Sequence, residues 1–181
     1  ISPDNFISVI EQDNDLINDF TRSILRKSVQ QLEIWLQQGI DLKISVNISM
    51  ENLDRFNLPE IYQEVVWNFN VPTDRVILEI TEGNLGKGFA QTLDILTRFR
   101  LKGFGLSIDD FGTGYSSLSH LAKLPIDTLK VDAFFVSKIP HDAYAVTLTE
   151  TILGLGRDLS LRMVAEGVET AEQLHFLQER G

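Results

Sequence analysis

Polar side chains that could bind a metal ion recur along the chain, each directly after a short apolar run. Their oxygens come from Asn47, Glu79, the adjacent Asp109 and Asp110, Asp132 and Glu166, and Lys130 adds an ammonium group. Carboxylate and amide oxygens without cysteine form a hard ligand set that suits Mg²⁺ or Mn²⁺. Two such ions about 4 Å apart can activate a water and stabilise both oxygens of a phosphoester displacement. We therefore expect metal-assisted phosphoester hydrolysis, in which Lys130 anchors the water or neutralises phosphate charge.

The segments around these residues alternate between two hydrophobic periodicities. Short apolar runs typical of buried strands cover 42–47, 76–80, 104–108, 128–131 and 161–165. Apolar residues at helical spacing cover 16–36, 58–69, 89–96, 118–122 and 148–159. A last helix is expected from Thr170, because Thr170 and Gln173 have the spacing of a capping box.

Repeated strand–helix units predict an α/β fold with a mostly parallel sheet, either open and doubly wound or closed as a barrel. The spacing favours the barrel, since a barrel of eight units uses about 250 residues. At that pitch the 181 residues hold fewer than eight units. In a barrel the polar strand ends meet at one mouth, which would bring the candidate residues together.

Composition narrows the possible functions. With 16 basic and 26 acidic residues the net charge is −10, which argues against a protein that embraces a nucleic-acid backbone. The absence of cysteine excludes disulfide scaffolds, thiolate zinc sites and thiol nucleophiles. There is no apolar stretch of membrane-spanning length, and residues 1–5 lack the basic start of a signal peptide. Bound cations would allow so acidic a chain to attract an anionic ligand.

The segment after Asp110 is rich in glycine and hydroxyl side chains. It contains Phe111, Gly112, Thr113, Gly114 and Ser116. Such a loop could hold an anion on backbone amides, act as a lid, or be a plain turn between strand and helix.

Aromatic and histidine side chains carry little functional signal. Trp35 and Trp67 lie in predicted helices and are expected in the core. His120, His141 and His175 have no metal-site spacing and are expected at the surface or in satisfied positions.

Five ordered motifs give the sequence a family resemblance. They are Val46–Ser49, Leu78–Glu82, Asp109–Leu118, Leu124–Asp132 and Ala165–Thr170. In this order and at this spacing they closely resemble the EAL domain, the bacterial phosphodiesterase module for cyclic di-GMP. The resemblance implies a modified TIM barrel that hydrolyses cyclic di-GMP to linear pGpG with two Mg²⁺ or Mn²⁺ ions.

The resemblance also implies roles for individual residues. Asn47, Glu79, Asp109 and Asp110 match metal ligands, with Asp109 between the ions. Lys130 matches the residue that contacts the hydrolytic water, and Asp132 a nearby carboxylate of the metal site. Glu166 matches an essential glutamate described as metal ligand or general base. Glu82 matches a glutamate that steadies the loop from Phe111 to Ser117.

Two departures lead to a further expectation about the domain. The signature Glu-Ala-Leu segment and the Gln-Gly segment of the last strand are absent. We therefore expect residues 1–181 to be one EAL domain fragment, a TIM-like barrel incomplete at both ends that lacks its first two strands and its last. The alternative to an enzyme is a catalytically inactive EAL-like module that binds cyclic di-GMP or a partner protein.

The family implies a setting as well. Homodimers and upstream sensor, receiver or GGDEF domains accompany such modules, and the location would be the bacterial cytoplasm, with no DNA or RNA polymer as partner.

Overall fold

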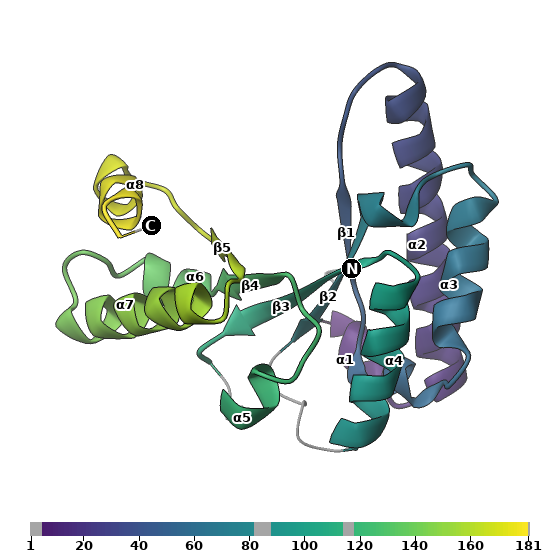
Figure 1. The fold of residues 1–181 in the computed structure, drawn as a ribbon, viewed down its shortest axis with the longest axis horizontal. Helices are drawn as coiled ribbons and strands as arrows, with labels where there is room; N and C mark the ends of the chain where they lie inside the picture. Colours follow the sequence, from purple (N-terminus) through teal and green to yellow (C-terminus); the bar gives the residue numbers. More distant parts are fainter. Residues whose placement is uncertain (1–4, 82–87, 114–117, 181) are drawn as a thin grey trace. The chain divides into compact units, whose positions relative to one another are not determined.

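Strands and helices alternate along the chain as the hydrophobic periodicity predicts (Figure 1). The computed structural model describes residues 5–81, 88–113 and 118–180. The strands are β1 (Ile44–Asn47), β2 (Val76–Thr81), β3 (Gly105–Phe111), β4 (Thr128–Val131) and β5 (Arg162–Ala165). The helices are α1 (Ile7–Ile10), α2 (Asn14–Gln37), α3 (Leu58–Trp67), α4 (Phe89–Leu101), α5 (Leu118–Leu121), α6 (Ala133–Val136), α7 (Ala143–Asp158) and α8 (Ala171–Gln178), with 3-10 turns η2 (Met50–Asp54) and η3 (Thr73–Arg75). The chain forms two compact units, 1–80 with 87–106 (unit 1) and 81–86 with 107–181 (unit 2).

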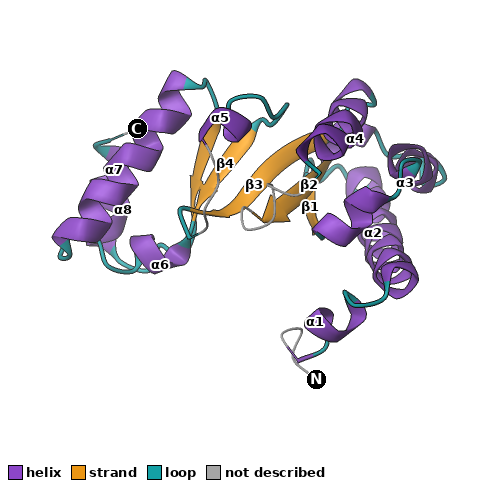
Figure 2. Ribbon diagram, turned by 90° about the horizontal axis from the view of Figure 1, so that it is seen from below, coloured by secondary structure: helices purple, strands orange, loops and turns teal. Residues whose placement is uncertain are grey.

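Unit 1 is a pair of parallel strands covered by three long helices. β1 pairs with β2 in a register that sets Val46 opposite Leu78. The helices α2, α3 and α4 lie on the same side of these strands (Figure 2). The aromatic rings of Tyr62 and Phe99 lie 5.6 Å apart between their centroids, and all of Tyr62 is buried. The buried stripe of each helix thus supplies the core that holds the two strands.

The longest helix, α2, has an N-terminal cap and a buried apolar stripe. The Asp13 side chain accepts hydrogen bonds from the backbone N–H groups of Asp15 and Leu16, which would otherwise lack partners at the helix start. Along the helix, Leu25, Val29 and Leu32 are fully buried at spacings of three and four residues.

Unit 2 contains three parallel strands in sequence order. β3 pairs with β4 and β4 with β5, so that β4 lies between the other two. Helix α7 packs on β4 and β5, and it does so closely at Gly156, where a Cβ atom would lie 1.9 Å from Met163 Sδ. The parallel pairing and the intervening helices confirm the predicted α/β class. The described residues contain five strands, whereas a complete (β/α)₈ barrel has eight.

Several expectations differ from the structure in instructive ways. β3 continues to Phe111, beyond the predicted end at residue 108, so Asp109 and Asp110 belong to the strand itself. Helix α6 was not predicted because four residues are too few to show a helical period. The prediction that Trp67 is in the core is wrong, since its side chain is 62% exposed. The buried positions of α3 are Leu58, Pro59, Tyr62 and Val66, and the last of these directly precedes Trp67.

The histidine expectations agree with the structure, since His141 and His175 are exposed and His120 is partly buried. Trp35, expected in the core, is only partly buried. No helix in the described ranges combines the length and apolar character that a membrane crossing requires.

The capping box of α8 generates a stability prediction. Gln173 N donates to Thr170 Oγ1 at 3.2 Å, and Thr170 N donates to Gln173 Oε1 at 3.0 Å. Thr170→Ala should cost about 1 kcal/mol, because it leaves a helix-start N–H without its partner. Thermal unfolding and hydrogen exchange at the Gln173 amide measure the loss. The matched control is Thr147→Ala, whose exposed hydroxyl bonds within α7. Equal stability of the two variants would contradict the capping role.

Candidate active site

An ammonium group held between two carboxylates marks the candidate site of unit 2. Lys130 Nζ lies 2.9 Å from Asp109 Oδ1 and 2.6 Å from Glu166 Oε1. Lys130 is on β4, Asp109 is on β3, and Glu166 follows β5 directly. The Lys130 and Asp109 side chains are only 12% and 13% exposed. The strand order therefore places the cation between carboxylates from its two neighbouring strands.

A third carboxylate joins this group. One oxygen from each of Asp109, Asp110 and Glu166 lies within 4.8 Å of the others. Three carboxylates so close together repel one another, and Lys130 supplies one positive charge against them. Their hard oxygen ligands and the excess negative charge suit a divalent cation such as Mg²⁺ or Mn²⁺. The residues present thus fit a metal site.

Two neighbouring aspartates reach the same site because the strand is irregular there. Successive side chains of a regular strand point to opposite faces. The register between β3 and β4 shifts between Ile108 and Phe111, and Asp110 has a φ of 53°, in the left-handed region. Thr113 secures this turn, since its backbone N–H and its hydroxyl both donate to Asp110 O. The bulge brings Asp110 into the same cluster as Asp109.

The surroundings of Asp110 favour its protonated form. Burial raises the pKa of Asp110, and a hydrogen bond with the Asp132 side chain raises it further. The negative charges of Asp109, Asp132 and Glu166 act in the same direction and bring the pKa to about 6. Repulsion between neighbouring carboxylates is the electrostatic state that a bound cation relieves.

Asp132 caps helix α6 and also lies beside Asp110. Its side chain accepts a hydrogen bond of 2.5 Å from Phe134 N and so caps α6. Among the described residues, Asp132 is not one of the carboxylates whose oxygens lie within 4.8 Å of one another. Asp132 therefore meets the cluster through Asp110.

Gly167 fixes the position of Glu166, and sequence reasoning missed it. Glu166 N donates to Val131 O at 3.1 Å, which extends the pairing of β5 with β4 by one residue. Gly167 then turns the chain with a φ of 69°, and a Cβ there would lie 2.7 Å from Ala133 Cβ. Only glycine satisfies both conditions readily. The sequence signal that could have identified Gly167 is a glycine directly after a carboxylate at the end of a predicted strand.

Two further predicted ligands lie in unit 1. Asn47, the last residue of β1, is the register partner of Glu79, which lies within β2 because that strand continues to Thr81. Ile48 N donates to Glu79 O at 2.9 Å, which continues the parallel pairing beyond Asn47. The structure thus places this amide and this carboxylate on adjacent strands, as the strand-end spacing predicts.

The predicted loop lies partly within the described residues. Phe111 is buried, and Gly112 has a φ of 102° with Phe135 and Ile152 less than 3 Å from where a Cβ would be. Thr113 bonds Asp110 as described above. Gly114, Ser116 and Glu82 lie outside the described residues.

Comparison with known proteins gives a consistent picture. Residues 1–181 match the EAL domain family. The cyclic di-GMP phosphodiesterase NbdA of Pseudomonas aeruginosa is 38% identical over 180 residues, 99% of this chain and 23% of that protein. The chain spans 22–34% of the length of the curated relatives it matches.

Solved structures resemble the chain in fold as well. The PaMucR phosphodiesterase in complex with c-di-GMP has a TM-score of 0.93 and 36% identity, covering 100% of this chain and 73% of that one. The calcium and cyclic di-GMP complex of Klebsiella pneumoniae BlrP1 has a TM-score of 0.84 and 27% identity, covering 99% of this chain and 45% of that one.

Gly167→Ala should weaken divalent-cation binding. The left-handed φ and the contact with Ala133 both force the new side chain to move the backbone that carries Glu166. We expect Mn²⁺ affinity, measured by calorimetry, to fall at least about tenfold, as when support behind a metal ligand is lost. Adding Ala133→Gly should restore part of the affinity. Gly154→Ala in α7, where a Cβ has open space, is the control. Unchanged affinity in Gly167→Ala would contradict the positioning role.

Asp110→Asn should stabilise the metal-free protein in a pH-dependent way. Asparagine tolerates the left-handed backbone and carries no charge. Asp110 has a pKa of about 6 when folded, against 3.8 for an ordinary aspartate side chain. Its ionisation therefore destabilises the folded state as pH rises through 6, and the variant is free of this loss.

We expect the melting temperatures to agree below about pH 4 and the variant to gain roughly 2–4 °C above about pH 7. This is the shift that about 1 kcal/mol produces, after the pKa difference is discounted for solvent screening of this partly exposed group. Saturating Mn²⁺ should reverse the order, since the variant loses the negative charge that attracts the ion. A variant that melts below the wild type without metal at pH 8 would refute the repulsion.

Proposed function

The chain belongs to the EAL domain family, and on that premise we propose that it forms part of a metal-dependent phosphodiesterase that hydrolyses cyclic di-GMP to linear pGpG. The observation that carries the proposal is the cluster in unit 2, where Lys130 lies between Asp109 and Glu166 beside Asp110. The names of relatives support the substrate, since NbdA is a cyclic di-GMP phosphodiesterase.

In this proposal the carboxylates hold two Mg²⁺ or Mn²⁺ ions. Asp109, Asp110 and Glu166 supply oxygens in unit 2, with Asp132 beside them, and the family resemblance adds Asn47 and Glu79 to the ligands. When bound, such ions lower the pKa of water and stabilise negative charge on phosphate oxygens. The family resemblance supports this ligand set, and the grouping of the three carboxylate oxygens within 4.8 Å supports its centre.

Lys130 orients the attacking water and balances phosphate charge. Its Nζ has three hydrogens, and two of them are directed to Asp109 and Glu166 at 2.9 and 2.6 Å. These two ion pairs fix the ammonium group in the cluster, so that its position is set before substrate arrives. A preorganised charge costs no reorganisation when the transition state forms.

Glu166 receives the proton of the water in this scheme. Its side chain is 34% exposed, more than that of Asp109 or Lys130, so it can exchange a proton with solvent. The water oxygen forms a new bond to phosphorus, and the bond from phosphorus to the ribose 3′ oxygen breaks. That 3′ oxygen leaves with a proton, and one water is consumed for each pGpG formed.

The same proposal assigns the residues around the cluster. Glu82 steadies the loop that begins at Phe111, and Gly112, Thr113, Gly114 and Ser116 belong to its substrate-facing part. The buried ring of Phe111 and the bonds from Thr113 to Asp110 O anchor the start of this loop to the site.

The proposed setting is a bacterial signalling protein that acts in the cytoplasm. The curated relatives are several times longer than this chain, which supports flanking sensor, receiver or GGDEF domains. Homodimerisation belongs to the same proposal through the family resemblance.

The decisive experiment follows hydrolysis of cyclic di-GMP by chromatography with Mg²⁺ or Mn²⁺, using the full-length protein that contains this chain. Lys130→Met and Glu166→Gln should each lower kcat at least about a hundredfold, the size of a general acid–base or preorganised electrostatic contribution. His175→Gln, an exposed change on α8, should leave turnover unchanged. Saturable nucleotide binding without turnover would establish the inactive module instead, and the absence of both would refute the proposal.

A further inference from the structure

A fully buried asparagine holds the chain segment that follows β1 in unit 1. Asn52 lies in the 3-10 turn η2, and none of it is exposed. Its Oδ1 accepts a hydrogen bond of 2.9 Å from Ser49 N, and its backbone N–H donates to Ser49 O at 3.1 Å. Ser49 is two residues beyond Asn47, the last residue of β1. A buried amide side chain thus fixes the backbone as it leaves the strand.

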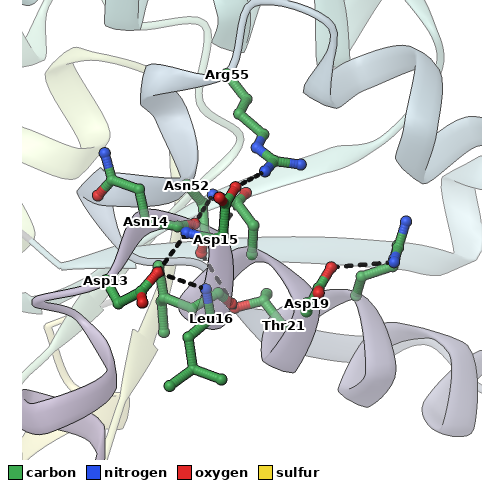
Figure 3. A network of polar contacts seen from close by, with 11 residues as sticks. Asp13, Asn14, Asp15, Leu16, Asp19, Thr21, Asn52 and Arg55 are labelled. Carbon is green, nitrogen blue, oxygen red and sulfur yellow. Dashed lines mark hydrogen bonds and ion pairs between the residues drawn. The ribbon is translucent and has the colours of Figure 1, made fainter.

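Helix α2 holds Asn52 from the other side. Asn52 Nδ2 donates to Asn18 Oδ1 at 3.3 Å, and Thr21 Oγ1 donates to Asn52 Oδ1 at 3.2 Å. Asn18 and Thr21 are each only 4% exposed. Figure 3 shows Asn52 and Thr21 within one network of polar contacts. Because a buried polar group that loses its partners is costly, this network leaves Asn52 few alternative positions.

Contacts with two helices fix the turn η2 itself. The Gln91 side chain of α4 donates to two backbone carbonyls of η2 at 3.3 Å each. Arg55, directly after η2, pairs with Asp15 of α2 (Figure 3). Asn52 therefore reaches Ser49 from a turn that is held on both sides.

These contacts reach Asn47 through two consecutive backbone amides. Ile48 N donates to Glu79 O at 2.9 Å, and the next N–H along the chain is the one that Asn52 accepts. Ile48 is buried whereas Asn47 is exposed, as expected where successive side chains point to opposite faces. The strand β2 and the Asn52 side chain together set the direction of the backbone that carries Asn47.

We propose that Asn52 is a positioning residue for metal binding, which holds Ser49 N and so keeps the Asn47 amide in place as a ligand. The inference rests on the proposed function, in which Asn47 is one of the metal ligands. Groups that hold a metal ligand from behind contribute about 10–100-fold to metal affinity, because they orient the ligand before the ion arrives.

The test is a double-mutant cycle on the full-length protein that contains this chain, with Mn²⁺ affinity measured by calorimetry. Asn52→Ala should weaken binding about tenfold, because it releases Ser49 N and the backbone after Asn47. In the Asn47→Ala background, Asn52→Ala should change the affinity by less than about twofold, because the ligand that it positions is gone. Hydrogen exchange at the Ser49 amide of the metal-free protein should become faster in Asn52→Ala.

Three further variants separate positioning from stability. Thr21→Val is the matched control, because it removes a buried hydroxyl of the same network and leaves the bond to Ser49 N. It should lower the melting temperature and leave Mn²⁺ affinity within about twofold. Asn52→Gln should also retain the affinity, since glutamine at this position of a capping box reaches back to the same N–H. Asn52→Leu has the same branched outline without an acceptor, and it repeats the measurement should Asn52→Ala not fold.

The outcomes distinguish this inference from the proposed function. Equal losses of affinity from Asn52→Ala with and without Asn47→Ala would overturn the inference, because Asn52 would then support only the fold. A loss in Thr21→Val as large as that in Asn52→Ala would overturn it as well. An Asn47→Ala variant that binds Mn²⁺ like the wild type would refute the ligand role of Asn47 in the proposed function, and the inference with it.

Discussion

The ion pairs of Lys130 are the interaction on which the rest of the site depends. Lys130 Nζ contacts Asp109 on β3 and Glu166 directly after β5, and these two strands lie on either side of β4. A lysine that is 12% exposed must be paired to remain charged, and a cluster of carboxylates must be neutralised to remain close together. The ion pairs between Lys130 and the carboxylates satisfy both requirements. The parallel pairing of β3, β4 and β5 exists before any ligand binds, and it delivers these charges to one edge of the sheet.

That arrangement demands departures from regular structure, and they occur in the residues next to the carboxylates. The bulge of β3 and the left-handed Asp110 place two adjacent aspartates in one cluster, which a regular strand could not do. On the other side of β4, Gly167 turns immediately after Glu166 and passes close to Ala133. Such local strain costs free energy that the hydrogen bonds and packing of neighbouring residues must offset. Irregular backbone thus lies beside the carboxylates on both sides of β4.

The sequence was sufficient for the five strands and the longer helices, and for naming Asp109, Asp110, Lys130 and Glu166 as candidates, because these depend on periodicity and on residue type. The short helices α1 and α6 were not predicted. Apolar spacing predicted the strands around Lys130 and Glu166, and strand ends rich in carboxylates predicted a hard metal site. It could not show the extension of β3 to Phe111, since Asp109 and Asp110 interrupt the apolar run that defines a strand. The sequence also could not show that Trp67 is exposed, because Tyr62 and Val66 determine which face of α3 is buried. Tertiary packing decided both.

The metal-free cluster stores electrostatic repulsion that cation binding would release. Asp110 lies beside three other carboxylates, and its pKa of about 6 measures how poorly the folded chain tolerates its charge. Cation binding restores the charged state, so the affinity for metal and the stability of the folded chain are linked quantities. Under the proposed function, bound ions would reverse the local field only at the site and so let a chain of net charge −10 accept a phosphodiester. Lys130 alone cannot do so, since its charge is already shared between Asp109 and Glu166.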